Sequence, residues 1–172
     1  TEIREVLVEK HQSLFKELID DLINKVTLFG LYFASLDIRQ DSRVHTSVMN
    51  AISEDYPNLF SKKYDDLSDA EKISELSNLQ GKIDSKSIKD EVAQKTIESM
   101  YAMKAIQKYN GEQGCNRYII SNNGSVVNVL EAFAMIRLCD WKNPTVDVIP
   151  LFETVDDLQE ADQVMEPLYT NP

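Results

Sequence analysis

Three times along the chain, a short apolar run is followed by a polar loop and then by an amphipathic helix, and this alternation constrains the fold most. We expect the apolar runs 31–38, 117–121 and 146–151 to be strands. Strands that alternate with helices form parallel sheets or barrels. Because so few strands cannot close a barrel, the predicted fold is helix-rich α/β: a partial TIM-like (β/α) barrel with about three parallel strands and extra helices. The βα units are expected near 31–53, 117–139 and 146–168.

Helices are also expected outside these units. The first segment is predicted to be one long helix, because apolar residues from Leu14 to Phe29 recur at helical spacing. Gly30 follows where a glycine commonly ends a helix. A helical insert is predicted over 68–109, beginning with a capping-box pattern at Ser68 and continuing as a long helix from about Ser87.

Composition excludes several classes of function. The net charge is −11 and no Lys/Arg cluster is present, which argues against a nucleic-acid partner and against binding to an anionic membrane. No apolar run approaches the ~20 residues of a membrane span, and no signal peptide is visible. Cys115 and Cys139 form no CxxC pair, so a reduced, cytoplasmic chain is expected. A start at Thr1 without Met and an end at Pro172 suggest a piece of a longer protein.

Polar residues follow each predicted strand. In parallel α/β folds ligands bind at the carboxyl ends of the strands, where this chain has Arg39, the loop Ser121–Ser125 and Glu153. The arginine fork of Arg39 can bind a phosphate or carboxylate through two parallel hydrogen bonds. The alternative for Arg39 is a local ion pair with Asp37 or Asp41.

Glu153 is the candidate metal ligand, because Mg²⁺ takes one or two carboxylates and leaves its other positions to water and substrate. The alternative is an acid stabilised by the start of the helix that follows. The Ser121–Ser125 loop could bind an anion or simply cap its helix. His45 is expected to be a surface or packing residue. No Ser/His/Asp triad, P-loop or dinucleotide fingerprint is present.

Two motifs resemble the phosphoenolpyruvate carboxylase family. Residues 33–46 read FASLDIRQDSRVHT, which is similar to that family's D-I-R-Q-x-S-x-x-H-T segment. Residues 148–158 read VIPLFETVDDL, which is similar to its P-L-F-E-T-x-D-D-L segment. Both occur in family order, so the resemblance identifies residues 1–172 as one internal fragment of the barrel domain of a bacterial-type enzyme.

The resemblance implies a carbon–carbon lyase. Such enzymes add bicarbonate to phosphoenolpyruvate and give oxaloacetate and phosphate, an anaplerotic carbon dioxide fixation that feeds the tricarboxylic acid cycle. Mg²⁺ or Mn²⁺ neutralises charge on the phosphoryl oxygens and the developing enolate. By position, Glu153 matches the family's metal-binding glutamate and Arg39 an arginine of the phosphoenolpyruvate site. The parent is expected to be a cytoplasmic homotetramer.

The chain departs from the family at two positions and lacks three segments. Asn122 stands where the family has Met, and Asn128 where it has Asp. The resemblance implies that the family's catalytic histidine, second metal carboxylate and glycine-rich loop lie outside residues 1–172, so no complete catalytic set is expected. A complete small metal-dependent lyase is not expected either, because only one metal carboxylate can be named. We expect the isolated chain to be inactive, to bind metal weakly or not at all, and to self-associate through exposed strands. The alternative function is a non-catalytic structural or interaction domain related to the barrel.

Overall fold

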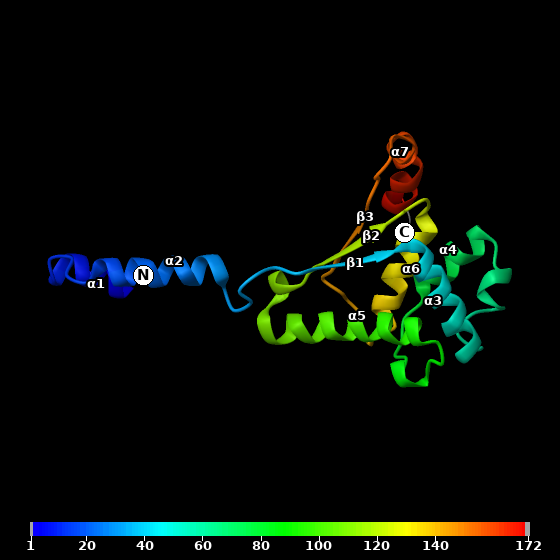
Figure 1. Ribbon diagram of the computed structural model, residues 1–172, viewed down its shortest axis with the longest axis horizontal. Helices are drawn as coiled ribbons and strands as arrows, with labels where there is room; N and C mark the ends of the chain where they lie inside the picture. The colour runs from blue at the N-terminus through cyan, green and yellow to red at the C-terminus, as the bar shows by residue number, and fades with distance from the viewer. Residues whose placement is uncertain (1, 171–172) are drawn as a thin grey trace. The chain divides into compact units, whose positions relative to one another are not determined.

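The computed structural model describes residues 2–170 and combines helices with a parallel sheet (Figure 1). Residues 1, 171 and 172, which belong to the predicted single unit 1–172, lie outside the residues that the structure describes. The α-helices are α1 (Glu2–Lys10), α2 (Lys16–Phe29), α3 (Ser42–Asp55), α4 (Asp69–Asn78), α5 (Glu91–Asn110), α6 (Val126–Arg137) and α7 (Val155–Thr170). The strands are β1 (Asp37–Asp41), β2 (Arg117–Ser121) and β3 (Asp147–Pro150), and the short 3-10 turns are η1 (Tyr64–Asp66), η2 (Ser85–Ser87) and η3 (Glu112–Gly114).

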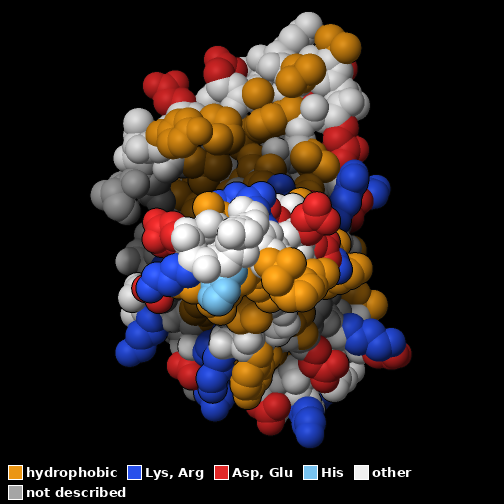
Figure 2. Space-filling model, turned by 90° about the vertical axis from the view of Figure 1, so that its left-hand side faces the viewer, with side chains coloured by type: hydrophobic (Ala, Val, Ile, Leu, Met, Phe, Trp, Pro, Cys, Tyr) orange, Lys and Arg blue, Asp and Glu red, His pale blue; other side chains and the backbone are white. Residues whose placement is uncertain are grey.

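The chain divides into two compact units, Thr1–Ser35 and Leu36–Pro172. The first holds α1 and α2, so the prediction of one long helix is wrong. The backbone leaves the helical region between them, where Phe15 adopts a left-handed φ of 61°. Gly30 ends α2 as predicted, with its N–H donating to the Val26 carbonyl at 3.0 Å. Figure 2 draws one face of the molecule, on which apolar side chains lie exposed among charged ones.

The second unit is built on the sheet, whose strands are parallel and follow the order β1-β2-β3. The predicted strand 117–121 is confirmed, and β3 lies within the predicted run 146–151. The prediction of a strand over 31–38 is wrong, because the segment that pairs with β2 is Asp37–Asp41. Leu31 and Leu36 are exposed, at 83% and 58%. Most of the predicted apolar run lies just before the strand, and the position of the strand itself is set by its pairing with β2.

The two faces of the sheet differ. Tyr118 and Ile120 are fully buried, and the Tyr118 hydroxyl lies 3.0 Å from His45 Nε2 of α3. Arg39, Ile119 and Ile149 lie in one row across the strands and share the opposite face. Figure 1 shows α3, α5 and α6 packed together beside the sheet. Their core residues include Met49, Ile52, Ile97, Met100, Met135 and Ile136.

Local signals account for most helix starts. The predicted capping box of α4 is present, with Ser68 N–H donating to Glu71 at 2.8 Å and Glu71 N–H donating to the Ser68 hydroxyl at 3.4 Å. Asp41 caps α3, with its side chain accepting from Arg43 N–H at 2.8 Å. The long helix α5 begins at Glu91, later than the predicted Ser87, because the Asp90 carboxylate caps it.

The predicted helix-rich α/β class with a parallel sheet is confirmed, while the partial barrel stays a prediction. The strands are joined by crossovers that contain helices, as such a barrel requires. Cys115 and Cys139 are buried free thiols. Within residues 2–170, the helices are too short or too polar to cross a lipid bilayer.

Candidate functional site

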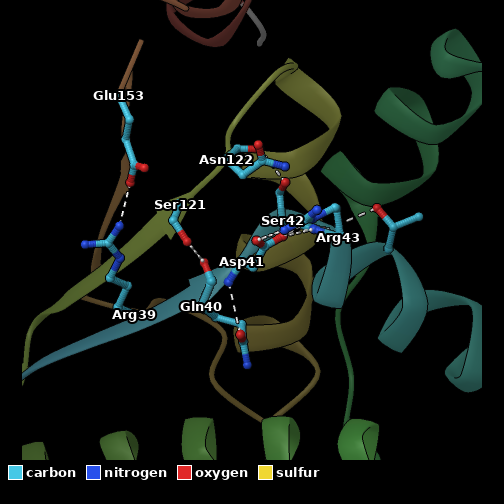
Figure 3. A network of polar contacts seen from close by, with 9 residues as sticks. Arg39, Gln40, Asp41, Ser42, Arg43, Ser121, Asn122 and Glu153 are labelled. Carbon is cyan, nitrogen blue, oxygen red and sulfur yellow. Dashed lines mark hydrogen bonds and ion pairs between the residues drawn. The ribbon is translucent and has the colours of Figure 1, made fainter.

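The carboxyl ends of the three strands bring together residues that are far apart in the sequence. Arg39 lies in β1, Ser121 ends β2, and Glu153 follows β3 just before α7. Parallel pairing places these three segments at one edge of the sheet. Figure 3 shows Arg39 and Glu153 pointing toward one another on this edge, with Ser121 and Asn122 on the strand and loop beside them.

Arg39 and Glu153 form an ion pair. Arg39 Nη2 donates to Glu153 Oε1 at 2.5 Å, and the residues are 114 positions apart. Their side chains are 58% and 45% exposed, so water and solutes reach both partners. The pair brings the two residues predicted from the sequence into direct contact. Arg39 therefore does not form the local ion pair with Asp37 or Asp41 that was its alternative.

The two neighbouring acids that could have paired with Arg39 have other partners. Asp37 accepts from Arg117 Nε at 2.8 Å, directly across the β1–β2 pairing. Asp41 accepts from Arg43 Nε at 3.0 Å and from Arg43 Nη2 at 2.7 Å. These hydrogen bonds from Arg43 lower the pKa of the Asp41 carboxyl to about 2. The Arg43 guanidinium is therefore held locally, while Arg39 reaches across the sheet.

Hydrogen bonds to β1, α3 and α6 hold the Ser121–Ser125 loop in place. Ser121 donates its hydroxyl to the Gln40 carbonyl at 3.4 Å, and Ser42 donates to the Asn122 carbonyl at 2.5 Å. Asn122 has a φ of 54°, a left-handed conformation that asparagine tolerates better than most residues. The side chain of Asn128 accepts from Gly124 N–H at 3.2 Å. The departures at Asn122 and Asn128 are thus compatible with a structural role in this loop.

A polar cavity of about 300 Å³ lies beside the loop. Ser42, Arg43 and Thr46 of α3 line it, as does Asn123 of the loop. Asn123 is 2% exposed, and within residues 2–170 its side-chain nitrogen and oxygen have no hydrogen-bond partner. The amide of Asn123 is therefore buried in the wall of this cavity.

One carboxylate at this edge fits a hard divalent cation. Glu153 is exposed, and its Oε1 already accepts a cationic group, the guanidinium of Arg39. Asp157 lies close by, but its Oδ2 accepts from the N–H groups of Glu153 and Thr154 at 3.1 and 2.9 Å. Among residues 2–170, no three His, Cys, Asp or Glu side chains are grouped to hold a metal ion. Glu153 can supply one ligand, and Mg²⁺ or Mn²⁺ would take the others from water, substrate or further protein groups.

A buried polar cluster, which we define as Glu131, Tyr64 and Thr46, was not predicted from the sequence. Glu131 of α6 is fully buried and accepts from the Tyr64 hydroxyl at 2.7 Å and the Thr46 hydroxyl at 3.0 Å. Burial raises the pKa of the Glu131 carboxyl. A lone glutamate within the otherwise apolar stretch of α6 was the signal that could have revealed it.

His45 packs in the interior, which agrees with the packing alternative expected for it. It is fully buried, and its Nδ1 has no partner within the described residues. Burial lowers the pKa of His45 to about 4. The imidazole is therefore neutral at pH 7 and lies on the helix-covered side of the sheet, behind the Arg39–Glu153 pair.

Comparisons with known proteins agree in pointing to one family. A family model described as phosphoenolpyruvate carboxylase matches residues 1–172. The chain is 34% identical over 172 residues to the phosphoenolpyruvate carboxylase of Thermosynechococcus vestitus, covering 95% of the chain and 17% of that protein. It is 32% identical over 177 residues to that of Nitrosomonas eutropha, covering 96% of the chain and 19% of that protein. The chain thus spans less than a fifth of the length of these relatives.

Proposed function

The chain belongs to the phosphoenolpyruvate carboxylase family, and from this premise we propose that it forms part of an enzyme that carboxylates phosphoenolpyruvate with bicarbonate to oxaloacetate and phosphate. Within that enzyme Arg39 binds the anionic substrate and Glu153 binds the divalent cation. The observation that carries the proposal is the convergence of these two side chains at the carboxyl edge of the sheet. A guanidinium beside a hard-metal carboxylate suits a substrate that carries both a phosphate and a carboxylate.

The two faces of the sheet support a partial barrel. Helices cover the Tyr118 face, whereas Arg39, Ile119 and Ile149 lie on the other face and remain partly exposed. In a (β/α) barrel the helices form the outer ring, and the inward face meets further strands. We therefore assign the Arg39 face to the barrel interior. The parent enzyme is proposed to be a cytoplasmic homotetramer.

Each residue of the pair has a defined task in the proposed reaction. Arg39 orients the substrate through its planar fork, since the guanidinium can bind two oxygens of one phosphate or carboxylate group. Glu153 holds Mg²⁺ or Mn²⁺, which supplies charge neutralisation at the phosphoryl oxygens and the developing enolate. His45 is fully buried beside Tyr118 on the helix-covered face of the sheet, so it has no assigned task in this reaction.

The test is oxaloacetate formation by the full-length polypeptide that contains this chain, wild type beside Glu153→Gln. We expect Mg²⁺-dependent activity that falls about 100-fold or more in the variant, the scale of losing one charge-stabilising group. Glu160→Gln, which makes the same change at an exposed glutamate of α7, serves as the matched control and is expected to keep its activity. An unaffected Glu153→Gln enzyme would remove Glu153 from the site. No wild-type activity would favour a non-catalytic domain.

The 172-residue chain alone is proposed to be inactive. Among the described residues 2–170, the proposed site takes one metal-binding carboxylate, Glu153, and one substrate-binding arginine, Arg39. Purified chain incubated with phosphoenolpyruvate, bicarbonate and Mg²⁺ should form no oxaloacetate above background. Measurable turnover by the purified chain would contradict this proposal.

A further inference from the structure

The ion pair at the carboxyl edge places a cation on the carboxylate that a metal would need. Arg39 Nη2 lies 2.5 Å from Glu153 Oε1. Mg²⁺ binds carboxylate oxygens at about 2.0–2.1 Å. A divalent cation on this carboxylate therefore meets the guanidinium at close range, and two like charges repel strongly at such a distance. The ion pair and a bound metal compete for Glu153.

Among the described residues 2–170, Glu153 is the only hydrogen-bond and ion-pair partner of the Arg39 side chain. Arg43, the other arginine at this edge, is held to Asp41 by two hydrogen bonds and does not contact Glu153. Loss of the Glu153 contact would thus leave the whole Arg39 fork available to an anion. The same event would leave Arg43 where it is.

We propose that the Arg39–Glu153 ion pair is an interlock that holds Arg39 on Glu153 until a divalent cation displaces it, so that the metal enables anion binding by Arg39. This inference rests on the proposed function, because it takes Glu153 as the metal ligand. The anion is the phosphorylated carboxylate substrate. Since coupling between two sites is reciprocal, the anion also strengthens metal binding by drawing Arg39 away from Glu153.

The exposure of the pair sets the size of the effect. Both side chains are accessible, at 58% and 45%, and exposed ion pairs are weak. Displacement of the guanidinium should therefore cost the metal only a factor of about two to five in affinity. Such an ion pair costs a bound metal little affinity, yet it keeps the guanidinium of Arg39 paired in the metal-free protein.

The first experiment measures Mn²⁺ affinity without substrate, by electron paramagnetic resonance of the free ion, in the full-length polypeptide. We expect Arg39→Gln to bind Mn²⁺ about two- to five-fold more tightly than the wild type. Arg43→Gln removes an equal charge at the same edge and should change the affinity by less than the Arg39 variant. Equal affinities in the wild type and Arg39→Gln, or equal gains in both variants, would overturn the interlock.

A third variant separates this inference from the proposed function. Glu153→Gln should weaken Mn²⁺ binding, because it removes the ligand itself. If Glu153→Gln binds Mn²⁺ as the wild type does, the metal assignment of Glu153 fails and the interlock fails with it. If Glu153→Gln weakens binding while Arg39→Gln matches the wild type, the metal assignment stands and only the interlock fails.

The second experiment follows Arg39 directly and needs no arginine variant. Phenylglyoxal modifies accessible arginines, and peptide mass spectrometry reports the rate at each one. We expect Mn²⁺ to raise the modification rate of Arg39 in the wild type and to leave that of Arg43 unchanged. In Glu153→Gln the Arg39 rate should be high with or without Mn²⁺. An Arg39 rate that ignores both Mn²⁺ and the Glu153 change would overturn the proposal.

Discussion

Two glutamates of this chain make long-range polar contacts in opposite environments. Glu153 lies at the open carboxyl edge and pairs with Arg39, and both side chains are partly exposed. Glu131 is fully buried between helices and accepts from the hydroxyls of Tyr64 and Thr46. An exposed ion pair adds little to stability and can exchange partners, whereas a buried carboxylate is costly unless its hydrogen bonds are made. The contrast separates a contact available to ligands from one that fixes the fold.

Of the changes at these two glutamates, Glu131→Ala should lower the free energy of unfolding most. The change leaves the Tyr64 and Thr46 hydroxyls without their acceptor and opens a void, so the free energy of unfolding should fall by about 2–4 kcal/mol. Urea denaturation of the 172-residue chain measures the effect. Glu131→Gln, which keeps the shape and one acceptor oxygen, should lose less than half as much. A loss below about 1 kcal/mol for Glu131→Ala would mean that the cluster does not hold the fold.

The buried side of the comparison also predicts a pH dependence through His45. Its pKa is lowered from 6.5 to about 4 by burial. Below pH 6.5 the His45 imidazole binds a proton in the unfolded chain, whereas in the folded chain it stays neutral down to about pH 4. The free energy of unfolding therefore falls as the pH drops through this window. At pH 5 this contribution amounts to a loss of about 2 kcal/mol relative to pH 7.

Glu131 acts in the opposite direction. Its pKa is raised by burial, so the folded chain holds this proton more tightly than the unfolded chain, and the resulting stability is lost as the pH rises through the folded pKa. Urea denaturation at pH 7 and pH 5 should therefore show the loss from His45 opposed by a contribution of opposite sign from Glu131. In His45→Gln the loss at pH 5 should shrink or reverse. A pH dependence that His45→Gln leaves unaltered would contradict the assignment.

Features fixed by neighbouring residues were predictable from the sequence. The start of α4 follows from Ser68 and Glu71, and Thr154 N–H donates to the Asp157 carboxylate where a helix start was expected. The strand Arg117–Ser121 was predictable because its β-forming residues lie between turn residues. The first strand was placed wrongly because its position depends on pairing with β2, which no local pattern encodes.

In the candidate site, too, the residues could be identified from local motifs but their long-range contacts could not. The two motifs singled out Arg39 and Glu153, but their contact joins residues 114 positions apart, and spacing alone favoured a neighbour such as Asp37. The fold prevents that local pairing because β1–β2 register sets Asp37 opposite Arg117. The same holds for Glu131. Its position in an apolar helix was visible in the sequence, but its hydrogen-bond partners on α3 and η1 were not.

The smallest expected effect is the stability contributed by the Arg39–Glu153 pair. A double-mutant cycle of Arg39→Gln and Glu153→Gln, each alone and together, isolates the interaction energy from other effects of either change. We expect a coupling below about 1 kcal/mol, because both side chains are partly exposed. It should shrink further in 1 M NaCl, where the screening length falls to about 3 Å. A coupling as large as the loss in Glu131→Ala would place the pair among the contacts that fix the fold, and would leave it too strong to yield Glu153 readily to a metal.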